Sequence, residues 1–152
     1  MVRVLSPHEI LERIPQQEPF RFIDSILEVD DDHVVALYRW RSDADFYRGH
    51  FPGQPVTPGV LLVESMAQAS VVSLGCYLLH KQLEEEEAAK LKPFFTEATV
   101  EFRDVVRPGE QVRIEARKIY FRRRKLKTEV EMQGEDGRVV CSGQLAGLAV
   151  PS

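Results

Sequence analysis

The sequence predicts an α+β fold in which an antiparallel sheet wraps around one long, buried helix. After a short helical segment come two strand-like segments, then an apolar helical segment at residues 60–79, and strand-like segments dominate after residue 93. The helical segment is apolar on nearly every side, which is typical of a helix buried all round. The 152 residues are enough for one hydrophobic core, so we expect a single domain over residues 1–152.

A short helix is expected first, over Pro7–Ile14. Ser6 is a suitable N-cap, a proline occupies the first helical position, and Glu9 stands three residues after the cap. Pro15 and Pro19 end this helix and lead into an extended segment.

A hairpin is expected next. Phe20–Val29 and His33–Arg41 are strand-like, and the three aspartates between them indicate a turn. Residues 42–56 are expected to form a loop.

The central helix is expected to begin with Thr57 as its N-cap and Pro58 at its first position, and to run over Val60–Leu79. The charged extension Lys81–Lys90 is predicted to be a solvated helix end. Glycine-containing turns at 108–109 and 135–137 separate the later strands. The strand-like segments in this part are Ala98–Phe102, Gln111–Phe121, Lys125–Gln133 and Val139–Val150.

Composition excludes several classes of function. The net charge of -4 disfavours nucleic acid as the main partner. Residues 1–19 lack the apolar run of a signal peptide, so we expect a cytoplasmic protein. The apolar stretch at 59–79 contains Glu64 and Gln68, which favours a core helix over a membrane span. Cys76 and Cys141 are too few for a disulfide framework or a zinc site, and both are expected to be small core residues.

Residues 50–64 are the most informative segment. His50 lies in a loop with three prolines and two glycines, and Glu64 lies inside the apolar helix that follows, with Gln68 one turn further on. Apolar neighbours should raise the pKa of the Glu64 carboxyl, which suits a general acid. Imidazole has an unperturbed pKa of about 6.5, which suits a general base. Taken alone, a loop histidine is usually a surface residue, and a glutamate near a helix start usually complements the helix dipole.

The start of this helix also predicts a site for a developing negative charge. Pro58 has no backbone N–H, so Gly59 and Val60 are the first candidate donors, and the helix dipole adds positive character there. An imidazole base, a carboxyl acid and such an oxyanion site together fit proton abstraction next to a thioester carbonyl.

The joint pattern is specific. Gly49-His50-Phe51-Pro52-Gly53 leads through Pro55 and Pro58-Gly59-Val60-Leu61 to Glu64 and Ala67-Gln68-Ala69. This run resembles the signature of the FabZ-type 3-hydroxyacyl-[acyl-carrier-protein] dehydratases. Further resemblance covers most of the chain, in Ile14-Pro15, Pro19-Phe20, Asp24, Phe102-Arg103, Val106 and Pro108-Gly109-Glu110-Gln111.

The resemblance implies a hot-dog fold and a homodimer whose two active sites lie at the interface, with the histidine from one protomer and the acid from the other. His50 would remove the C2 proton of a 3-hydroxyacyl thioester, Glu64 would protonate the leaving hydroxyl, and the Gly59 N–H would bind the thioester carbonyl. The supporting residues would be Gln68, Phe51 and Pro58, and Phe94 and Phe95 would line the acyl tunnel.

The resemblance also implies that no metal or other cofactor is needed and that acyl carrier protein delivers the substrate. Glutamate at position 64 resembles the type that dehydrates without isomerising the double bond. A trimer of dimers is common in the FabZ group, and the sequence leaves that assembly open.

Three departures from the family pattern leave the acyl chain length and the pathway open. Gln16-Gln17-Glu18 replaces a His-Arg-Tyr run, Pro93 stands close to the position of a gating tyrosine, and the extension Lys81–Lys90 is long. Two other functions remain as alternatives: a thioester hydrolase built on the same scaffold, and an acyl-binding subunit without activity.

A basic run, Arg122–Lys125 followed by Lys127, is predicted to lie at a strand turn. It fits an acidic carrier protein through charge steering. A solvated hairpin tip explains the same residues equally well.

Overall fold

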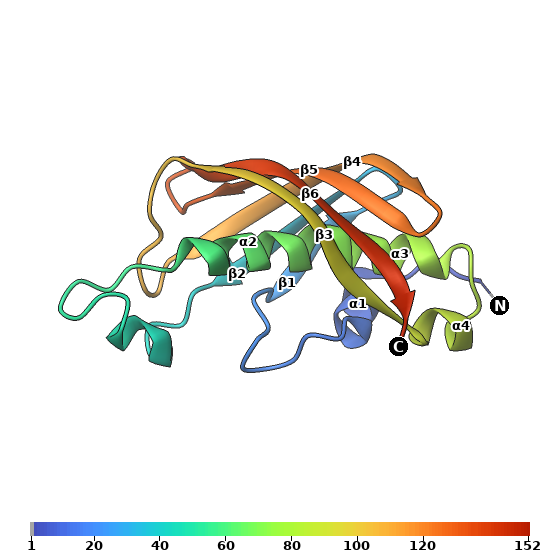
Figure 1. Ribbon diagram of the computed structural model, residues 1–152, viewed down its shortest axis with the longest axis horizontal. Helices are drawn as coiled ribbons and strands as arrows, with labels where there is room; N and C mark the ends of the chain where they lie inside the picture. The colour runs from blue at the N-terminus through green and yellow to red at the C-terminus, as the bar shows by residue number, and fades with distance from the viewer. Residues whose placement is uncertain (1) are drawn as a thin grey trace.

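The computed structural model describes residues 2–152, and its sheet has six antiparallel strands in the order β1-β2-β4-β5-β6-β3. The strands are β1 (Ser25–Val29), β2 (His33–Arg39), β3 (Leu91–Phe102), β4 (Gln111–Arg122), β5 (Lys125–Gln133) and β6 (Val139–Pro151). The sheet curves around one long helix, and β3 forms one of its two edges (Figure 1). The predicted α+β class, with a sheet wrapped around a helix, is confirmed.

The central helix is continuous from Gly59 to His80, but its hydrogen-bond pattern changes in the middle. It consists of α2 (Gly59–Ala67), a π-helical turn η2 (Gln68–Val72) and α3 (Ser73–His80). The Ser73 N–H and its hydroxyl both donate to the carbonyl of Gln68, the hydroxyl at 2.7 Å, and so close the wider turn. Apolar composition does not distinguish a π turn from an α turn. Such turns are frequent at functional sites.

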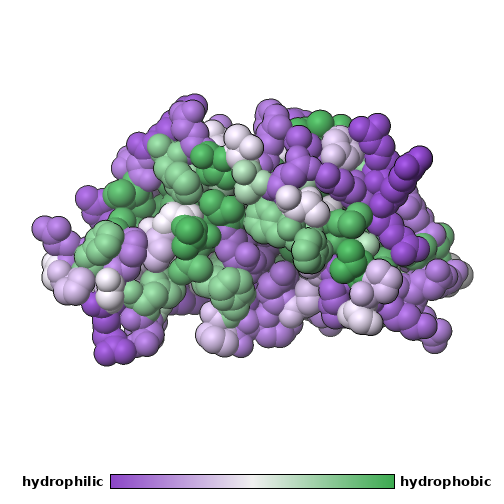
Figure 2. All heavy atoms as spheres, viewed as in Figure 1, coloured by the Kyte–Doolittle hydropathy of each residue, from purple (hydrophilic) through white to green (hydrophobic). Residues whose placement is uncertain are grey.

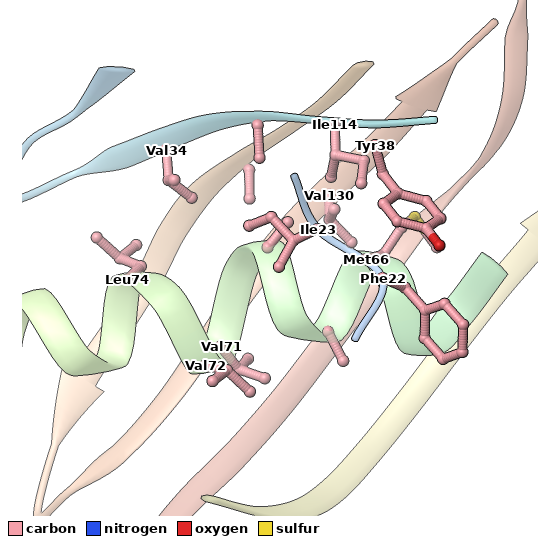
Figure 3. Packing of buried hydrophobic residues seen from close by; sticks show 14 of the residues in the cluster. Phe22, Ile23, Val34, Tyr38, Met66, Val71, Val72, Leu74, Ile114 and Val130 are labelled. Carbon is pink, nitrogen blue, oxygen red and sulfur yellow. The ribbon is translucent and has the colours of Figure 1, made fainter. Parts of the chain in front are cut away.

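The core lies between this helix and the concave face of the sheet. In Figure 3, sheet residues such as Val34, Tyr38 and Ile114 point toward the helix residues Met66 and Leu74, and all five are buried. Gly59–His80 is, within residues 2–152, the one helix long and apolar enough to cross a membrane. It packs against the concave face of the sheet, as expected for the core helix that the sequence predicts.

Of the two elements predicted near the N-terminus, the first helix is confirmed and the start of the first strand is wrong. The first helix, α1 (Pro7–Arg13), has the predicted capping box between Ser6 and Glu9. The first strand begins at Ser25 rather than at residue 20, so that prediction is wrong by five residues.

Side chains of the central helix explain this shorter first strand. The Phe22 N–H donates to Gln68 Oε1 at 2.7 Å, and its carbonyl accepts from the Ser65 hydroxyl at 2.7 Å. The Phe20 carbonyl accepts from Gln68 Nε2 at 3.0 Å. These backbone groups are therefore used by the helix instead of by a strand ladder.

The predicted N-cap is also wrong. Pro58 is the N-cap of α2 and Gly59 is the first helical residue. The Thr57 hydroxyl bonds the hydroxyl of Tyr47 at 2.7 Å, and the Thr57 N–H donates to the Val106 carbonyl at 2.9 Å. Thr57 is buried and holds the loop against the core, with Tyr47 supplied by a 3-10 turn, η1 (Asp45–Arg48), inside the predicted loop.

Strand β3 begins at Leu91, seven residues before the predicted start at 98, and passes through Pro93. A proline lacks the N–H for a ladder bond, but an edge strand has one side on which none is needed. Because β3 is an edge strand, the extended start is allowed, and Phe94 and Phe95 lie within the strand.

The charged extension is exposed at Glu84–Glu87, as predicted for a solvated segment, but it does not continue the central helix. The central helix ends at His80, and a separate short helix, α4 (Glu85–Ala89), follows. Glu85 contacts Arg13 Nη2 at 2.8 Å and His80 Nε2 at 3.0 Å, so α4 is attached to both α1 and α3. Figure 1 shows α4 beside the end of α3.

Candidate active site

His50 is held in one orientation by the loop that carries it. Its Nδ1 lies 2.8 Å from the carbonyl oxygen of Val56, and the Val56 N–H donates to the His50 carbonyl at 2.9 Å. A carbonyl oxygen can only accept, so Nδ1 carries the hydrogen in this contact. In neutral imidazole the lone pair is then on Nε2, which is the form a general base requires.

The loop is stiffened further by contacts within it. Phe51 and Gln54 exchange two backbone hydrogen bonds, of 3.2 and 2.9 Å. The Phe51 ring stacks on the His50 imidazole with their centroids 4.1 Å apart, and it remains 54% exposed. His50 is therefore a half-buried group on a rigid loop, with an apolar ring packed on one side.

Glu64 lies in α2, the second functional element, and is half-buried. Burial raises the pKa of its carboxyl, and a hydrogen bond from Gln68 Nε2 to Glu64 Oε2, 2.9 Å long, offsets part of that rise. The raised pKa predicted from the apolar neighbours is confirmed. A carboxyl of this kind stays protonated to higher pH and suits proton donation.

Gln68 fixes the orientation of Glu64, and its own orientation is set by the backbone. Its Oε1 accepts from the Phe22 N–H, which can only donate, and its Nε2 faces the Phe20 carbonyl, which can only accept. The second hydrogen on Nε2 is thus directed at Glu64. Gln68 is fully buried and starts the π turn, so this amide is a rigid support for the acid.

The helix start presents backbone N–H groups, as the sequence predicts. Leu61 and Leu62 donate the first helical bonds, both to the Pro58 carbonyl, so the N–H groups of Gly59 and Val60 precede the first intrahelical donors. The space beside Gly59 is occupied by a ring: a Cβ added there would lie 3.2 Å from Phe102 Cε1. The missing side chain of Gly59 accommodates Phe102 of β3.

A cavity of about 630 Å³ lies beside the central helix, between it and the N-terminal part of β3. Glu64, Phe94 and Phe95 line it, together with apolar residues of η2, such as Val71 and Val72, and of α3, such as Leu79. Among the described residues, five of the predicted site lie outside this lining: His50, Phe51, Pro58, Gly59 and Gln68. One chain therefore places the acid in the cavity and the imidazole outside it.

Further polar groups that sequence reasoning missed line the same cavity. Arg13, His80 and Glu85 form a cluster at its wall, and Cys76 stands beside them. Cys76 is half-buried, unlike the fully buried Cys141, and burial raises the pKa of its thiol to about 12. Across residues 2–152, no three histidine, cysteine or acidic side chains are grouped as metal ligands would be.

Comparison with protein families gives one match over most of the chain. Residues 14–145 match the model of the FabA-like domain. The chain is 37% identical over 139 residues to the 3-hydroxyacyl-[acyl-carrier-protein] dehydratase FabZ of Streptococcus uberis, covering 90% of this chain and 92% of that protein. It is 34% identical over 143 residues to the FabZ dehydratase of Clostridium perfringens, covering 93% and 96%.

Solved structures with the same fold are more distant in sequence. The dehydratase heterocomplex ApeI:P from Xenorhabdus doucetiae superposes with a TM-score of 0.72 at 18% identity, covering 97% of this chain and 93% of that one. A thioesterase from Haemophilus influenzae superposes with a TM-score of 0.68 at 14% identity, covering 99% and 94%. At such identities the likeness shows the hot-dog fold alone.

Proposed function

The chain belongs to the FabA-like family, and from this membership we propose that it dehydrates 3-hydroxyacyl thioesters bound to acyl carrier protein, in fatty-acid biosynthesis. The observation that carries the proposal is the state of the two titratable groups. His50 has its Nδ1 engaged and its Nε2 available, while the half-buried Glu64 has a raised pKa. A base and an acid of this kind are what the reaction needs. The proposal includes a cytoplasmic location.

The reaction breaks the C2–H and C3–O bonds of the substrate and forms the C2–C3 π bond and the new O–H bond of the released water. His50 Nε2 takes the C2 proton of the substrate, the electron pair of that bond forms the C2–C3 double bond, and the C3–oxygen bond breaks. Glu64 gives its proton to the departing hydroxyl, which leaves as water. The Gly59 N–H, at the positive end of α2, stabilises the charge that gathers on the thioester oxygen when the C2 proton is removed. His50 then returns its proton to the Glu64 carboxylate through solvent.

The proposed site is shared between two copies of the chain. Strand β3 is a 12-residue edge strand that is exposed along nearly its whole length. Phe94, Phe95 and Phe102 are exposed on it, Phe51 is exposed on the His50 loop, and Val60 is exposed at the start of α2. Figure 2, which views the same face as Figure 1, shows hydrophobic atoms gathered across its middle. A long apolar edge favours pairing with another strand.

Pairing of β3 with the β3 of a partner would cover these residues. It would also supply, from the partner's loop, the imidazole that the cavity of one chain lacks. The proposed assembly is thus a homodimer with His50 of one protomer facing Glu64 of the other. Assembly into a trimer of dimers is compatible with this contact.

The experiment that tests the function follows the ultraviolet absorbance of the enoyl thioester when purified protein is mixed with a 3-hydroxyacyl thioester. Dehydration leaves the thioester intact, so a thiol-release assay run in parallel separates it from hydrolysis. Enoyl formation without thiol release supports the proposal. Thiol release without enoyl formation, or binding of the thioester with neither product, contradicts it.

The basic hairpin between β4 and β5 supports docking of the acidic carrier protein. Arg123 and Arg124 form its two-residue turn, with positive φ values of 51° and 62°, and Arg124 also lines the cavity. Lys125 and Lys127 already pair with Glu97, at 2.5 and 3.5 Å. The two arginines of the turn are therefore the residues best placed to meet a carrier that brings a substrate to this cavity.

We expect the double change Arg123→Asp and Arg124→Asp to raise the KM for a carrier-bound substrate about tenfold at low salt, since charge reversal opposes steering. Aspartate tolerates positive φ, so the turn is retained. The KM for a short pantetheine thioester should stay unchanged, and Arg123→Asn with Arg124→Asn should give an intermediate KM for the carrier. Equal effects on both substrates would show that the hairpin does not dock the carrier.

A further inference from the structure

One carboxylate joins three separate elements at the wall of the cavity. Arg13 of α1 directs Nη2 to Glu85 Oε1 at 2.8 Å and Nε to both carboxylate oxygens at 3.1 and 3.2 Å. His80, the last residue of α3, places Nε2 3.0 Å from Glu85 Oε2. These three side chains, here called the clamp, all line the cavity.

Arg13 and His80, the two partners of Glu85, are each also held by a hydrogen bond to the backbone of their own helix. Arg13 Nη1 donates to the Glu9 carbonyl of its own helix at 3.0 Å, and His80 Nδ1 contacts the Cys76 carbonyl at 2.8 Å. His80 is 4% exposed. The hydrogen bonds from Arg13 and then His80 lower the pKa of Glu85 to about 2, so Glu85 is ionised at any pH at which the protein would work.

The helix that the clamp holds is too short to form alone. Helix α4 has five residues, Glu85–Ala89, and an isolated helix of this length is not stable in water. Ala88, which is buried, and Ala89, which is exposed, both line the cavity. Its far end is attached to the sheet through the Lys92 ammonium, which donates to the Ala89 carbonyl at 3.2 Å.

We propose that α4, held in place by the Arg13–Glu85–His80 clamp, is the wall that limits the length of the acyl chain this protein accepts. The proposal rests on the proposed function, which places an acyl chain in the cavity. Two small alanines keep the wall close to the cavity without filling it. A longer chain would have to displace α4, and displacement would break the contacts between Glu85 and the two other elements.

Two substitutions in this wall should shift the length preference in opposite directions. Glu85→Ala releases α4 and should raise the ratio of kcat/KM for long over short 3-hydroxyacyl thioesters about tenfold, the discrimination typical of one or more methylene groups in an apolar pocket. Ala89→Leu fills the cavity and should lower the same ratio about tenfold. Glu86→Ala, an exposed neighbour outside the cavity lining, is the matched control.

The experiment measures kcat/KM over 3-hydroxyacyl chains of increasing length for the whole protein and these variants. In parallel, calorimetry measures the Kd of saturated acyl-pantetheine thioethers of the same lengths, which cannot react. Thermal unfolding checks that each variant is folded, and Glu85→Gln replaces Glu85→Ala if the latter is not. Opposite shifts of the preferred length in both series, with Glu86→Ala unchanged, establish the wall.

A preferred length that is the same in all variants would overturn the proposal. If the wild-type protein dehydrates no 3-hydroxyacyl thioester of any length, the proposed function fails. The Kd values of the thioethers then test by themselves whether α4 limits the length of the bound chain. Binding that does not depend on length, or that Glu85→Ala leaves unchanged in its length dependence, overturns the wall in that case.

Discussion

Replacing His50 by alanine is expected to lower kcat for dehydration about 10²- to 10⁴-fold, the usual contribution of a positioned general base. The reason is that Nε2 is the basic atom of the ring, because Nδ1 is engaged with the Val56 carbonyl. The KM should change little, since the imidazole acts on one proton and contributes little to binding the acyl chain. Initial rates of enoyl formation over a range of substrate concentrations measure both constants.

His8→Ala is the control for this change, since the side chain of His8 is 86% exposed on α1, apart from the cavity lining. It should leave kcat unchanged. A His50→Ala protein that is folded and keeps more than about a tenth of wild-type kcat would show that another group removes the proton.

Replacing Glu64 by glutamine is expected to lower kcat by a similar factor, about 10²- to 10⁴-fold, because the amide cannot donate the acidic proton. The side chain keeps its size, and its oxygen can still accept the hydrogen bond from Gln68. Glu12→Gln, on the exposed face of α1, serves as the control. Unchanged kcat in the Glu64→Gln protein would remove Glu64 from the mechanism.

The Glu64→Gln substitution should also change the stability of the fold, and the raised pKa of the Glu64 carboxyl determines the direction of that change. Burial raises the pKa of Glu64 above its ordinary value of 4.5, so the folded protein binds this proton more tightly than the unfolded chain does. Ionised Glu64 therefore costs folding free energy, a cost that is absent below pH 4.5 and grows as the pH rises through the folded pKa. The Tm of the Glu64→Gln protein should equal the wild-type Tm at low pH and exceed it at pH 8. A Tm lower than wild type at pH 8 would contradict a desolvated carboxyl.

Local sequence patterns predicted much of the fold. Strands β4, β5 and β6 lie within a residue of their predicted ends, because alternating side chains and glycine turns act over a few positions. The start of β1 could not be predicted in this way, because Gln68, which lies 46 positions after Phe22, captures the backbone there. The start of β3 depends on its place at the edge of the sheet, which a local pattern does not contain.

In the candidate site, too, residues close together in the sequence could be predicted, and contacts between distant residues could not. His50, Glu64 and Gln68 stand in one segment with a recognisable motif, so the residue types and their spacing were enough to select them. The clamp could not be predicted, because Arg13 and Glu85 are 72 positions apart and neither local sequence pattern indicates that the two side chains meet. The glutamate run 84–87 is exposed, as predicted, but its local pattern does not show that Glu85 contacts Arg13 of α1 and His80 of α3.

The most direct test of the shared site mixes two inactive proteins. His50→Ala and Glu64→Gln chains are dissociated, combined in equal amounts and allowed to reassociate. In a mixed dimer, one site has both substitutions and the other has neither, provided that each site takes His50 from one protomer and Glu64 from its partner. Half of the dimers are mixed and each has one intact site, so activity should return to about a quarter of wild type for a two-fold symmetric dimer. If His50 and Glu64 of the same chain formed a site, every site would carry one substitution, and activity that stays at the level of the separate variants would contradict the shared active site.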